Sequence, residues 1–300
     1  MIFEECKLFR DVAHLRSLSR AAQLNGISQS AATQYIQQLE GRMGVELLDR
    51  TTRPLGLTAA GKLYADLCRD VLRREEDFTA SMADLKGAIE GTFRVASIYS
   101  IGLSEMPLLR EQFAHVCPDV QLHVEYLRPN KVYEAVLGDQ ADIGFISYPE
   151  SNRDLTIIPW REERMMVAAH PSHPFAGRAL VTPAELNGQN FIAFDEEVII
   201  QRELDRFFRD NQIQVTITMQ FDNIQSIKEA VALGSGISIL PERTIVTEVD
   251  QRRLIAIPLD APELVRPTGI IHRKKKKLTR AGVEFLQLVR GTLTLAAVVA

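Results

Sequence analysis

The sequence predicts a protein of mixed α/β class in three parts: a compact helical region, one long helix, and a two-lobed region of alternating strands and helices. Three observations support this order. Apolar residues recur at helical spacing up to residue 58, and one apolar stripe then follows a helix of about 30 residues. From residue 91 onward, short apolar runs alternate with helical segments. A length of 300 residues suits about two or three domains.

Composition excludes several classes of protein. The formal net charge is −4, from 35 basic and 39 acidic side chains, so contact with nucleic acid has to come from local placement of charge. No run of about 18 apolar residues predicts a membrane span, and the acidic N-terminus lacks the apolar stretch of a signal peptide. Cys6, Cys68 and Cys117 are far apart and odd in number, which fits thiols in a reducing cytoplasm and neither a disulfide framework nor a metal site.

Residues 1–58 predict short helices that end in a hairpin. Ser19 is a candidate N-cap for one helix. Asn25-Gly26 then makes a tight break, because both residues tolerate a positive φ. Ser28 is expected to start the next helix, which reaches about Arg42. The residues expected to face inward on that helix are Ala31, Ala32, Tyr35, Ile36 and Leu39.

A basic loop follows these helices. Two short apolar pieces, at residues 47–48 and 55–57, flank the polar sequence from Arg50 to Pro54. This pattern is typical of a β-hairpin wing. Residues 1–58 are therefore expected to form a winged helix-turn-helix domain that binds DNA.

The helix that starts at Ser28 supplies the candidate base-reading face. Residues 30, 33, 34 and 37 lie at i, i+3, i+4 and i+7 and so share one side of the helix. Short polar and amide side chains near a helix N-terminus reach base edges in the major groove, where glutamine can pair with adenine. The alternative is the solvated polar face of an ordinary helix. The candidate residues are Ser28, Gln29, Ser30, Thr33, Gln34 and Gln37.

The wing carries two arginines. Arg53 is a candidate for the minor groove, whereas Arg50 is either a DNA contact or half of a structural ion pair, and the sequence leaves both open. Residues 1–58 hold seven basic and six acidic side chains, a local net charge of +1. One copy should therefore bind DNA weakly, and useful affinity needs several copies on one site.

Residues 59–90 predict a linker helix that begins after a cap at Thr58 and reaches about residue 89. One narrow apolar stripe runs along it, while its other faces are charged. The apolar stripe of such a long helix is best buried against the same helix of a second copy. The alternative is a helix packed on its own domain. The stripe consists of Leu63, Leu67, Val71, Phe78, Met82, Leu85 and Ile89.

Residues 91–300 predict two α/β lobes, one formed by about 91–163 with 269–300 and the other by about 164–268. The first lobe reads as strand, helix, strand, helix, strand, which implies a mostly parallel sheet. A second set of alternating strands and helices follows the segment 155–169. The chain is expected to cross between the lobes near residues 163–167 and 268–272, with a cleft between them, an architecture like that of periplasmic binding proteins.

At this point the sequence resembles the LysR-type transcriptional regulators along its whole length. Ser30 and the pair Thr33-Gln34 depart from the family, which often has Pro and Ser-Arg there, so base preferences do not transfer. The resemblance implies a tetramer, as two dimers on an interrupted palindrome, with RNA polymerase as a candidate further partner. The matching segments are residues 17–22, 27–36, 38–40, 44–50, 57–61, 141–144, 173–175 and 234–241.

The ligand-sensing region contains a candidate binding site for a small anion at Ser100, called the seat below. The strand ending at Ile98 leads into Ser100 and the free N–H groups of a following helix. A carboxylate or an inorganic oxyanion is expected, with Arg128 as charge partner, although Pro129 can turn Arg128 outward. The alternative is that these residues are helix caps and turn residues. The candidate ligand residues are Ser100, Ile101, Arg128, Asn130, Ser147, Tyr148, Asp195 and Asn223.

The sequence therefore predicts a ligand-responsive regulator that binds double-stranded DNA and a second copy of itself. A solute-binding protein of periplasmic type and an enzyme with a DNA-binding arm are the competing classes. No cofactor, metal site or catalytic arrangement is expected, since the histidine pair at 170 and 173 lies in a proline-rich loop without a third ligand.

Overall fold

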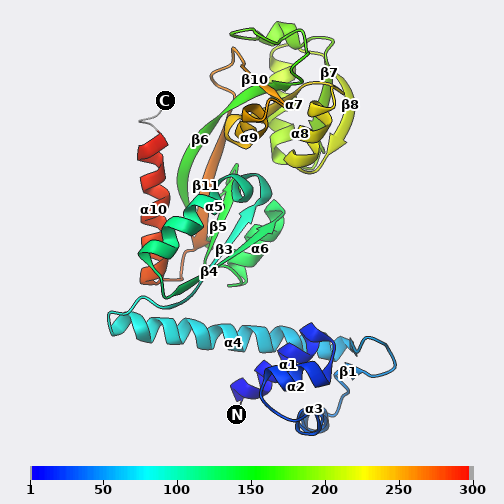
Figure 1. Cartoon of the computed structure of the whole chain (residues 1–300), viewed down its shortest axis with the longest axis vertical. Helices are drawn as coiled ribbons and strands as arrows, with labels where there is room; N and C mark the ends of the chain where they lie inside the picture. Colours follow the sequence, from blue (N-terminus) through cyan, green and yellow to red (C-terminus); the bar gives the residue numbers. More distant parts are fainter. Residues whose placement is uncertain (1, 297–300) are drawn as a thin grey trace. The chain divides into compact units, whose positions relative to one another are not determined.

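The computed structural model describes residues 2–296 and divides into two compact units, Met1–Gly91 (unit 1) and Thr92–Ala300 (unit 2). Each is described by itself (Figure 1). Among the described residues, no helix is both long enough and apolar enough to cross a membrane.

Unit 1 is a helical domain with a small hairpin. Its core brings together Phe9 of α1, Ile36 of α3, Cys68 of α4 and Leu47 from the loop before β1. The hairpin strands pair antiparallel, with Leu48 opposite Leu57, as expected for a wing. The elements are α1 (Ile2–Leu15), α2 (Leu18–Leu24), α3 (Gln29–Met43), β1 (Leu48–Asp49), β2 (Gly56–Leu57) and α4 (Ala59–Leu85).

The helix starts in unit 1 follow local capping chemistry. Ser28 caps α3 as expected, because its Oγ accepts a hydrogen bond from the Ala31 N–H at 3.1 Å. The expected cap at Ser19 is wrong: Ser17 takes that role, accepting from the Arg20 N–H, and α2 begins at Leu18. The inward placement of Tyr35 is also wrong, since its side chain is exposed.

Helix α4 begins at the expected cap, where the Thr58 Oγ1 accepts from the Gly61 N–H at 2.9 Å. It ends at Leu85 rather than at residue 89, because Lys86 is the C-cap and Gly87 adopts a φ of +83° that stops the helix. Ile89 therefore does not continue the apolar stripe on this helix.

Two faces of α4 differ in burial. Ala65, Cys68 and Leu72 pack into the core of unit 1. The predicted stripe points elsewhere and is exposed at Leu63, Leu67, Phe78, Met82 and Leu85, with Val71 half-buried. The alternative of a helix packed on its own domain thus describes one face of α4 and not the stripe.

Unit 2 is built around a seven-stranded sheet in the order β10-β6-β11-β5-β3-β4, with β9 paired to β6, and a smaller pair, β7-β8. Strand β3 runs parallel to β5, whereas β11 runs antiparallel to both β5 and β6. Its strands are β3 (Gly91–Ile98), β4 (Val120–Leu127), β5 (Ile143–Ser147), β6 (Leu155–Ala169), β7 (Asn190–Phe194), β8 (Thr216–Phe221), β9 (Ser238–Pro241), β10 (Ile255–Pro258) and β11 (Val265–Arg273).

Helices cover these strands in two lobes. Lobe I holds α5, α6 and α10, and lobe II holds α7, α8, α9 and the short 3-10 turns η1 and η2. The bounds are α5 (Tyr99–Val116), α6 (Pro129–Leu137), η1 (Pro183–Leu186), α7 (Ile199–Asp210), α8 (Ile224–Ala232), η2 (Glu242–Thr244), α9 (Val246–Asp250) and α10 (Arg280–Ala296).

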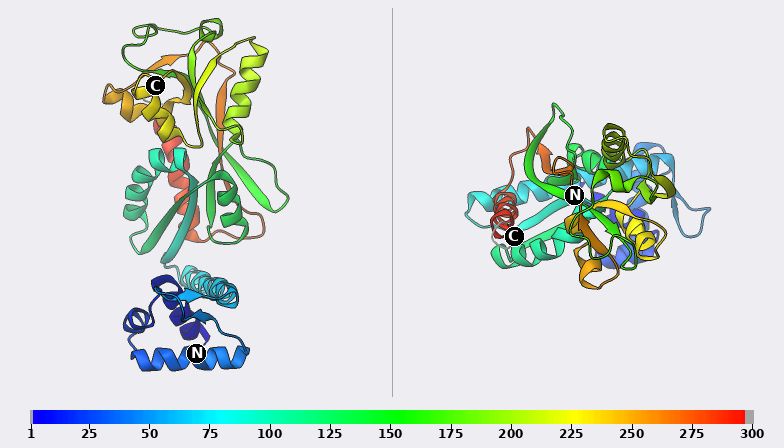
Figure 2. Two further views of the ribbon diagram at one scale, coloured as in Figure 1. Left: turned by 90° about the vertical axis from the view of Figure 1, so that its right-hand side faces the viewer. Right: turned by 90° about the horizontal axis from the view of Figure 1, so that it is seen from above.

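Strands β6 and β11 join the lobes, and in both views they run from one lobe into the other (Figures 1 and 2). Strand β6 pairs with β11 along residues 155–164 and then with β9 and β10 along 165–169. The sequence placed the crossings at these segments but did not identify 155–169 as one strand. It also placed the start of α5 at residue 103, whereas the helix begins at Tyr99, directly after β3.

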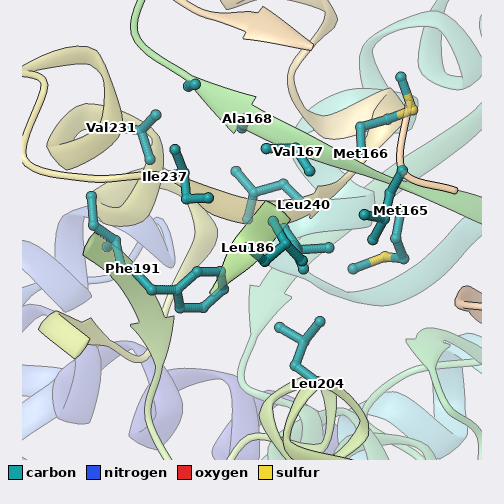
Figure 3. Close-up of a cluster of buried hydrophobic side chains, with 14 of the residues drawn as sticks. Met165, Met166, Val167, Ala168, Leu186, Phe191, Leu204, Val231, Ile237 and Leu240 are labelled. Atoms are coloured by element: carbon teal, nitrogen blue, oxygen red, sulfur yellow. The ribbon is translucent and has the colours of Figure 1, made fainter. Parts of the chain in front are cut away.

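Each lobe has its own core. Phe285 of α10 contacts Phe93, Phe113 and Phe145 in lobe I, with ring centroids 5.2 to 6.4 Å apart. In lobe II, Figure 3 shows Leu186, Phe191 and Leu204 facing the β6 residues Met165 to Ala168. The crossing strands contribute to both lobes, so a residue on β6 or β11 near the crossing can affect both.

Candidate functional site

Helix α3 exposes the polar face that the sequence predicts. Gln29, Ser30, Gln34 and Gln37 are exposed, while Ile36 on the opposite side is buried. Three of the candidates already have partners: the Ser28 hydroxyl caps the helix and lies 2.9 Å from the Ser30 hydroxyl, and the Thr33 hydroxyl donates to the Gln29 carbonyl at 2.9 Å. The amide groups of Gln29, Gln34 and Gln37 are thus the larger free donors and acceptors on this face.

Arg50 forms the ion pair that one of its two predicted roles requires. Its guanidinium forms an ion pair with Glu40 at 2.7 Å, which favours the structural role. The other oxygen of Glu40 accepts from the N–H groups of Leu47 and Leu48 at 2.8 and 3.1 Å. Burial raises the pKa of the Glu40 carboxyl, but hydrogen bonds from Arg50 and these two N–H groups lower it more, so its pKa lies below the ordinary value. Arg53 is exposed at the tip.

In unit 2, Ser100 lies in the first turn of α5, just beyond the end of β3, and is half-buried. Its Oγ accepts a hydrogen bond from Arg266 at 2.9 Å. The N-cap of α5 is Ile98, without a side-chain bond, so the reading of Ser100 as a helix cap is wrong. The candidate seat thus consists of the Ser100 hydroxyl and, bound to it, the guanidinium of Arg266, which the sequence did not identify.

Arg266 is buried, only 2% exposed, on the crossing strand β11. Its Nε donates to Glu163 of the neighbouring strand β6 at 2.8 Å, and Nη2 donates to the same carboxylate oxygen. A charge this deeply buried is tolerated only when it is paired and hydrogen-bonded. Glu163 lies at the first predicted crossing, but Arg266 lies two residues before the second, so the sequence did not single out this pair.

Arg128 does not join Ser100. Its side chain is 73% exposed and forms an ion pair with Asp222 at 2.5 Å. This pair links the start of α6 in lobe I to the start of α8 in lobe II. Because Pro129 begins α6, the Arg128 backbone is extended there and its side chain turns outward. The prediction of Arg128 as the direct charge partner of an anion at Ser100 is not supported by this geometry.

The remaining candidate ligand residues differ in burial and in structural role. Asn223 caps α8, with its Oδ1 accepting from the Ser226 N–H at 2.9 Å, as the cap reading predicts. Ile101 is buried in the core, and Asn130 is exposed. Ser147 and Asp195 are half-buried.

Tyr148 differs from these residues. Its hydroxyl is buried and has no hydrogen-bond partner, and its backbone has a φ of +49°. Burial raises its pKa to about 12, the positive charge of Arg266 opposes that rise, and the negative charges of Glu203 and Glu163 add to it. Tyr148 therefore stays protonated near Arg266, as a neutral donor.

Among the described residues, no group of His, Cys, Asp and Glu could hold a metal ion. His170 instead bonds within its own loop, to the Ser172 hydroxyl at 2.7 Å. All three cysteines are free and buried.

Unit 1 is thus a winged helix-turn-helix domain, and unit 2 is a two-lobed α/β domain with polar groups where the lobes are joined. Two family models match the chain. Residues 3–62 match the bacterial regulatory helix-turn-helix protein of the lysR family, and residues 86–294 match the LysR substrate binding domain. The chain belongs to the LysR family of transcriptional regulators.

Relatives agree with this assignment along nearly the whole chain. A probable RuBisCO transcriptional regulator of Phaeodactylum tricornutum is 26% identical over 284 residues, covering 93% of this chain and 92% of its own. The RuBisCO operon transcriptional regulator of Allochromatium vinosum is 24% identical over 285 residues, covering 95% and 94%. Since the relatives are named as regulators, the chain is a DNA-binding regulator with an effector-binding domain and not an enzyme.

Solved structures share the fold. Full-length CbnR, solved with its target DNA, aligns with a TM-score of 0.75 at 22% identity, covering 97% of this chain and 99% of its own. The regulatory domain of CcmR from Synechocystis PCC6803, solved with 2-PG, aligns with a TM-score of 0.61 at 22% identity, covering 67% and 96%.

Proposed function

We propose that this regulator acts in the cytoplasm as an oligomer and that a small anion, a carboxylate or an inorganic oxyanion, controls it by binding at Ser100 between the two lobes. The observation that carries the ligand assignment is the half-buried Ser100 hydroxyl, in the first turn of α5 and hydrogen-bonded to the buried Arg266. The free N–H groups at the start of α5 add donors that favour negative charge. The regulatory domain of CcmR, which shares the fold, was solved with 2-PG.

The ligand assignment is tested by thermal denaturation of the full chain in a series of organic acids and oxyanions. At least one anion should raise the melting temperature of the wild type. Ser100→Ala should abolish that shift, whereas Arg128→Ala should keep it, because Arg128 is exposed and paired with Asp222. A shift that persists in Ser100→Ala, or the absence of any shift in the wild type, would show that the seat lies elsewhere or that the ligand is not an anion.

Oligomerisation is proposed to use the apolar stripe of α4. Leu63, Phe78 and Leu85 are 74%, 65% and 81% exposed, an arrangement that costs free energy unless a partner covers it. A second α4 with the same stripe supplies a matching surface and brings two α3 helices to one DNA site. A tetramer of two such dimers, and contact with RNA polymerase, are the further steps that the family resemblance suggests.

Sedimentation velocity of the full chain tests this step. Leu67→Glu places a charge in the stripe and should shift the protein toward monomers and weaken DNA binding in a mobility-shift assay. Lys62→Gln, an exposed position on another face of α4, serves as the matched control and should leave the sedimentation coefficient unchanged. An unchanged coefficient in Leu67→Glu would reject α4 as the interface.

DNA binding itself is proposed to read bases through the amide groups of α3, with Arg53 in the minor groove. The low local charge of unit 1 makes this binding sensitive to salt and dependent on more than one copy. A mobility-shift titration with the DNA upstream of the protein's own gene, in increasing salt, is the direct measurement. Sequence-specific binding should weaken steeply as salt rises.

A further inference from the structure

The contacts of Arg266 continue into a longer set of paired charges. Glu163, which holds Arg266, also accepts a hydrogen bond from the Arg161 Nε at 3.2 Å. The Nη2 of Arg161 lies 2.7 Å from the carboxylate of Glu105 on α5. Glu105 in turn accepts from the Nε and Nη2 of Arg243 at 2.9 and 3.2 Å. These five residues (Arg243, Glu105, Arg161, Glu163 and Arg266) are called the ion chain below.

The ion chain spans both lobes and both crossing strands. Arg243 belongs to η2 of lobe II, and Glu105 to α5 of lobe I. The middle members lie on the crossing strand β6, and Arg266 on β11. Its last donor is the Nη1 of Arg266, which reaches the Ser100 hydroxyl. The ion chain therefore ends at the proposed anion seat.

The charges of the ion chain nearly balance. Arg161, Glu105, Glu163 and Arg266 are almost fully enclosed, and their two positive and two negative charges sum to zero. Arg243, whose side chain is 41% exposed, adds one positive charge. Glu242 beside Arg243 is exposed to solvent, and Glu203 near Tyr148 is paired with Arg206 at 3.0 Å. The seat thus has no more than one uncompensated positive charge behind it.

Glu105 keeps its negative charge. Burial raises the pKa of Glu105, but the hydrogen bonds from Arg243 and the charge of Arg161 lower it more, so its pKa lies below the ordinary value. Glu105 therefore counts as a full negative charge at neutral pH. Tyr148 adds a hydrogen bond without adding a charge, since its hydroxyl is buried, unpartnered and protonated.

We infer that the ion chain makes the seat at Ser100 selective for singly charged anions, with Arg266 as the residue that sets the charge and Tyr148 as a neutral donor to a ligand oxygen. This inference rests on the proposed anion seat and adds the charge class of the ligand. A monoanion brings the summed charge of the ion chain and the ligand to zero. A dianion leaves one negative charge uncompensated beside Glu163, where solvent screens it poorly.

The single tryptophan of the chain reports on the site. Trp160 is buried next to Arg161 on β6, and the Arg161 guanidinium stacks 3.7 Å from the centre of its ring. An anion that binds Arg266 changes the field on Glu163 and Arg161 and so changes the fluorescence of Trp160. Titration of the full chain at constant ionic strength, with sodium chloride as the balancing salt, measures the apparent Kd.

Methanesulfonate and sulfate are matched probes, because both are tetrahedral sulfur oxyanions and they differ by one unit of charge. Acetate and oxalate form a second pair. In the wild type, each monoanion should bind about tenfold more tightly than its dianion. Ser100→Ala should abolish both responses, which ties the signal to the seat.

Three variants test the role of charge. Glu163→Gln raises the net charge behind the seat to +2 and should reverse the preference toward sulfate. Arg243→Gln lowers it to zero and should weaken methanesulfonate binding by about tenfold. Arg243→Gln also guards against misfolding of Glu163→Gln, because Arg243 is partly exposed. Glu229→Gln removes a surface carboxylate paired with Arg253 and should change neither Kd.

The outcomes separate the inference from the proposed function. Sulfate that binds the wild type as tightly as methanesulfonate, in a manner lost in Ser100→Ala, overturns the charge selectivity and leaves the anion seat intact. A preference that stays the same in Arg243→Gln likewise overturns the role of the ion chain. If none of the four anions changes Trp160 fluorescence or the melting temperature, both the seat and its selectivity are wrong.

Discussion

The polar face of α3 and the ion chain of unit 2 both present polar groups, but they are built in opposite ways. The α3 face is exposed, uncharged and made of residues within one helix. The ion chain is enclosed, fully charged and joins residues more than 100 positions apart in the sequence. The first can be changed without disturbing the fold, because water replaces what is lost. In the second, each charge depends on its neighbours, so binding and stability cannot be separated.

The largest expected effect is from Arg266→Ala, which removes the buried partner of one Glu163 oxygen and leaves that carboxylate with only the 3.2 Å contact of Arg161. Breaking a buried pair in this way costs about 3–5 kcal/mol of unfolding free energy. Urea unfolding followed by Trp160 fluorescence reports on unit 2 alone, since the chain has no other tryptophan. Arg128→Ala, which removes an exposed pair, should change the midpoint little. Equal effects of the two changes would contradict the contrast between enclosed and exposed charges.

Unit 1 has a packing constraint that is nearly as severe. Gly61 in the first turn of α4 lies so close to the wing that an added Cβ would fall 1.9 Å from the Leu47 carbonyl oxygen. Gly61→Ala should destabilise unit 1 by about 1–3 kcal/mol and weaken DNA binding. Gly41→Ala, in α3 with nothing within 4 Å, should instead stabilise the helix by about 0.5–1 kcal/mol. Helical circular dichroism during thermal unfolding measures both.

A smaller effect, confined to binding, is expected from the α3 face. Gln34→Ala should weaken specific DNA binding by about 1–3 kcal/mol, because it removes an amide that can pair with a base edge. The slope of affinity against salt should stay the same, since Gln34 carries no charge. Gln23→Ala, an exposed glutamine on α2 and outside this face, is the control. A fall in the thermal stability of Gln34→Ala would show that side chains of the α3 face also stabilise the fold.

The smallest expected effect is a pH dependence at the wing. The pKa of Glu40 is lowered in the folded protein, so its contribution to stability is present above the unfolded value of 4.5 and is lost as pH falls through the folded pKa. Unfolding of the wild type should therefore become easier below about pH 4.5, and Glu40→Gln should flatten that part of the profile. Urea midpoints between pH 3 and pH 7 provide the comparison. If the urea midpoint of Glu40→Gln falls with decreasing pH as steeply as that of the wild type, Glu40 is not the source of the pH dependence.

The elements that the sequence predicts well are those set by neighbours along the chain. Ser28 and Thr58 cap α3 and α4 because the hydroxyl that begins each helix reaches an N–H three residues later. The wing, the polar side of α3 and the family assignment follow from equally local patterns. The errors are local as well: Ser17 rather than Ser19 caps α2, and Gly87 ends α4 before Ile89.

The proposed anion seat likewise has one part that the sequence predicts and one part that it does not. Periodicity and strand ends led to Ser100, because a residue after a buried strand lies at the edge of the sheet. The partner of Ser100 could not be found from the sequence, since Arg266 is 166 residues away and is selected by the pairing of β6 with β11. Arg128 was predicted as the charge partner because it follows the end of a neighbouring strand, but the extended backbone before Pro129 turns it toward Asp222.

The sequence by itself thus determined the helix-turn-helix, the apolar stripe of α4, the two-lobed fold and the family. Each of these depends on capping, periodicity or motif spacing over a few turns of chain. Only the tertiary structure decided which charges are enclosed together and which hydroxyl they support. The physical reason is that a buried ion pair is specified by strand register and by the exclusion of water, and both arise only when distant segments pack.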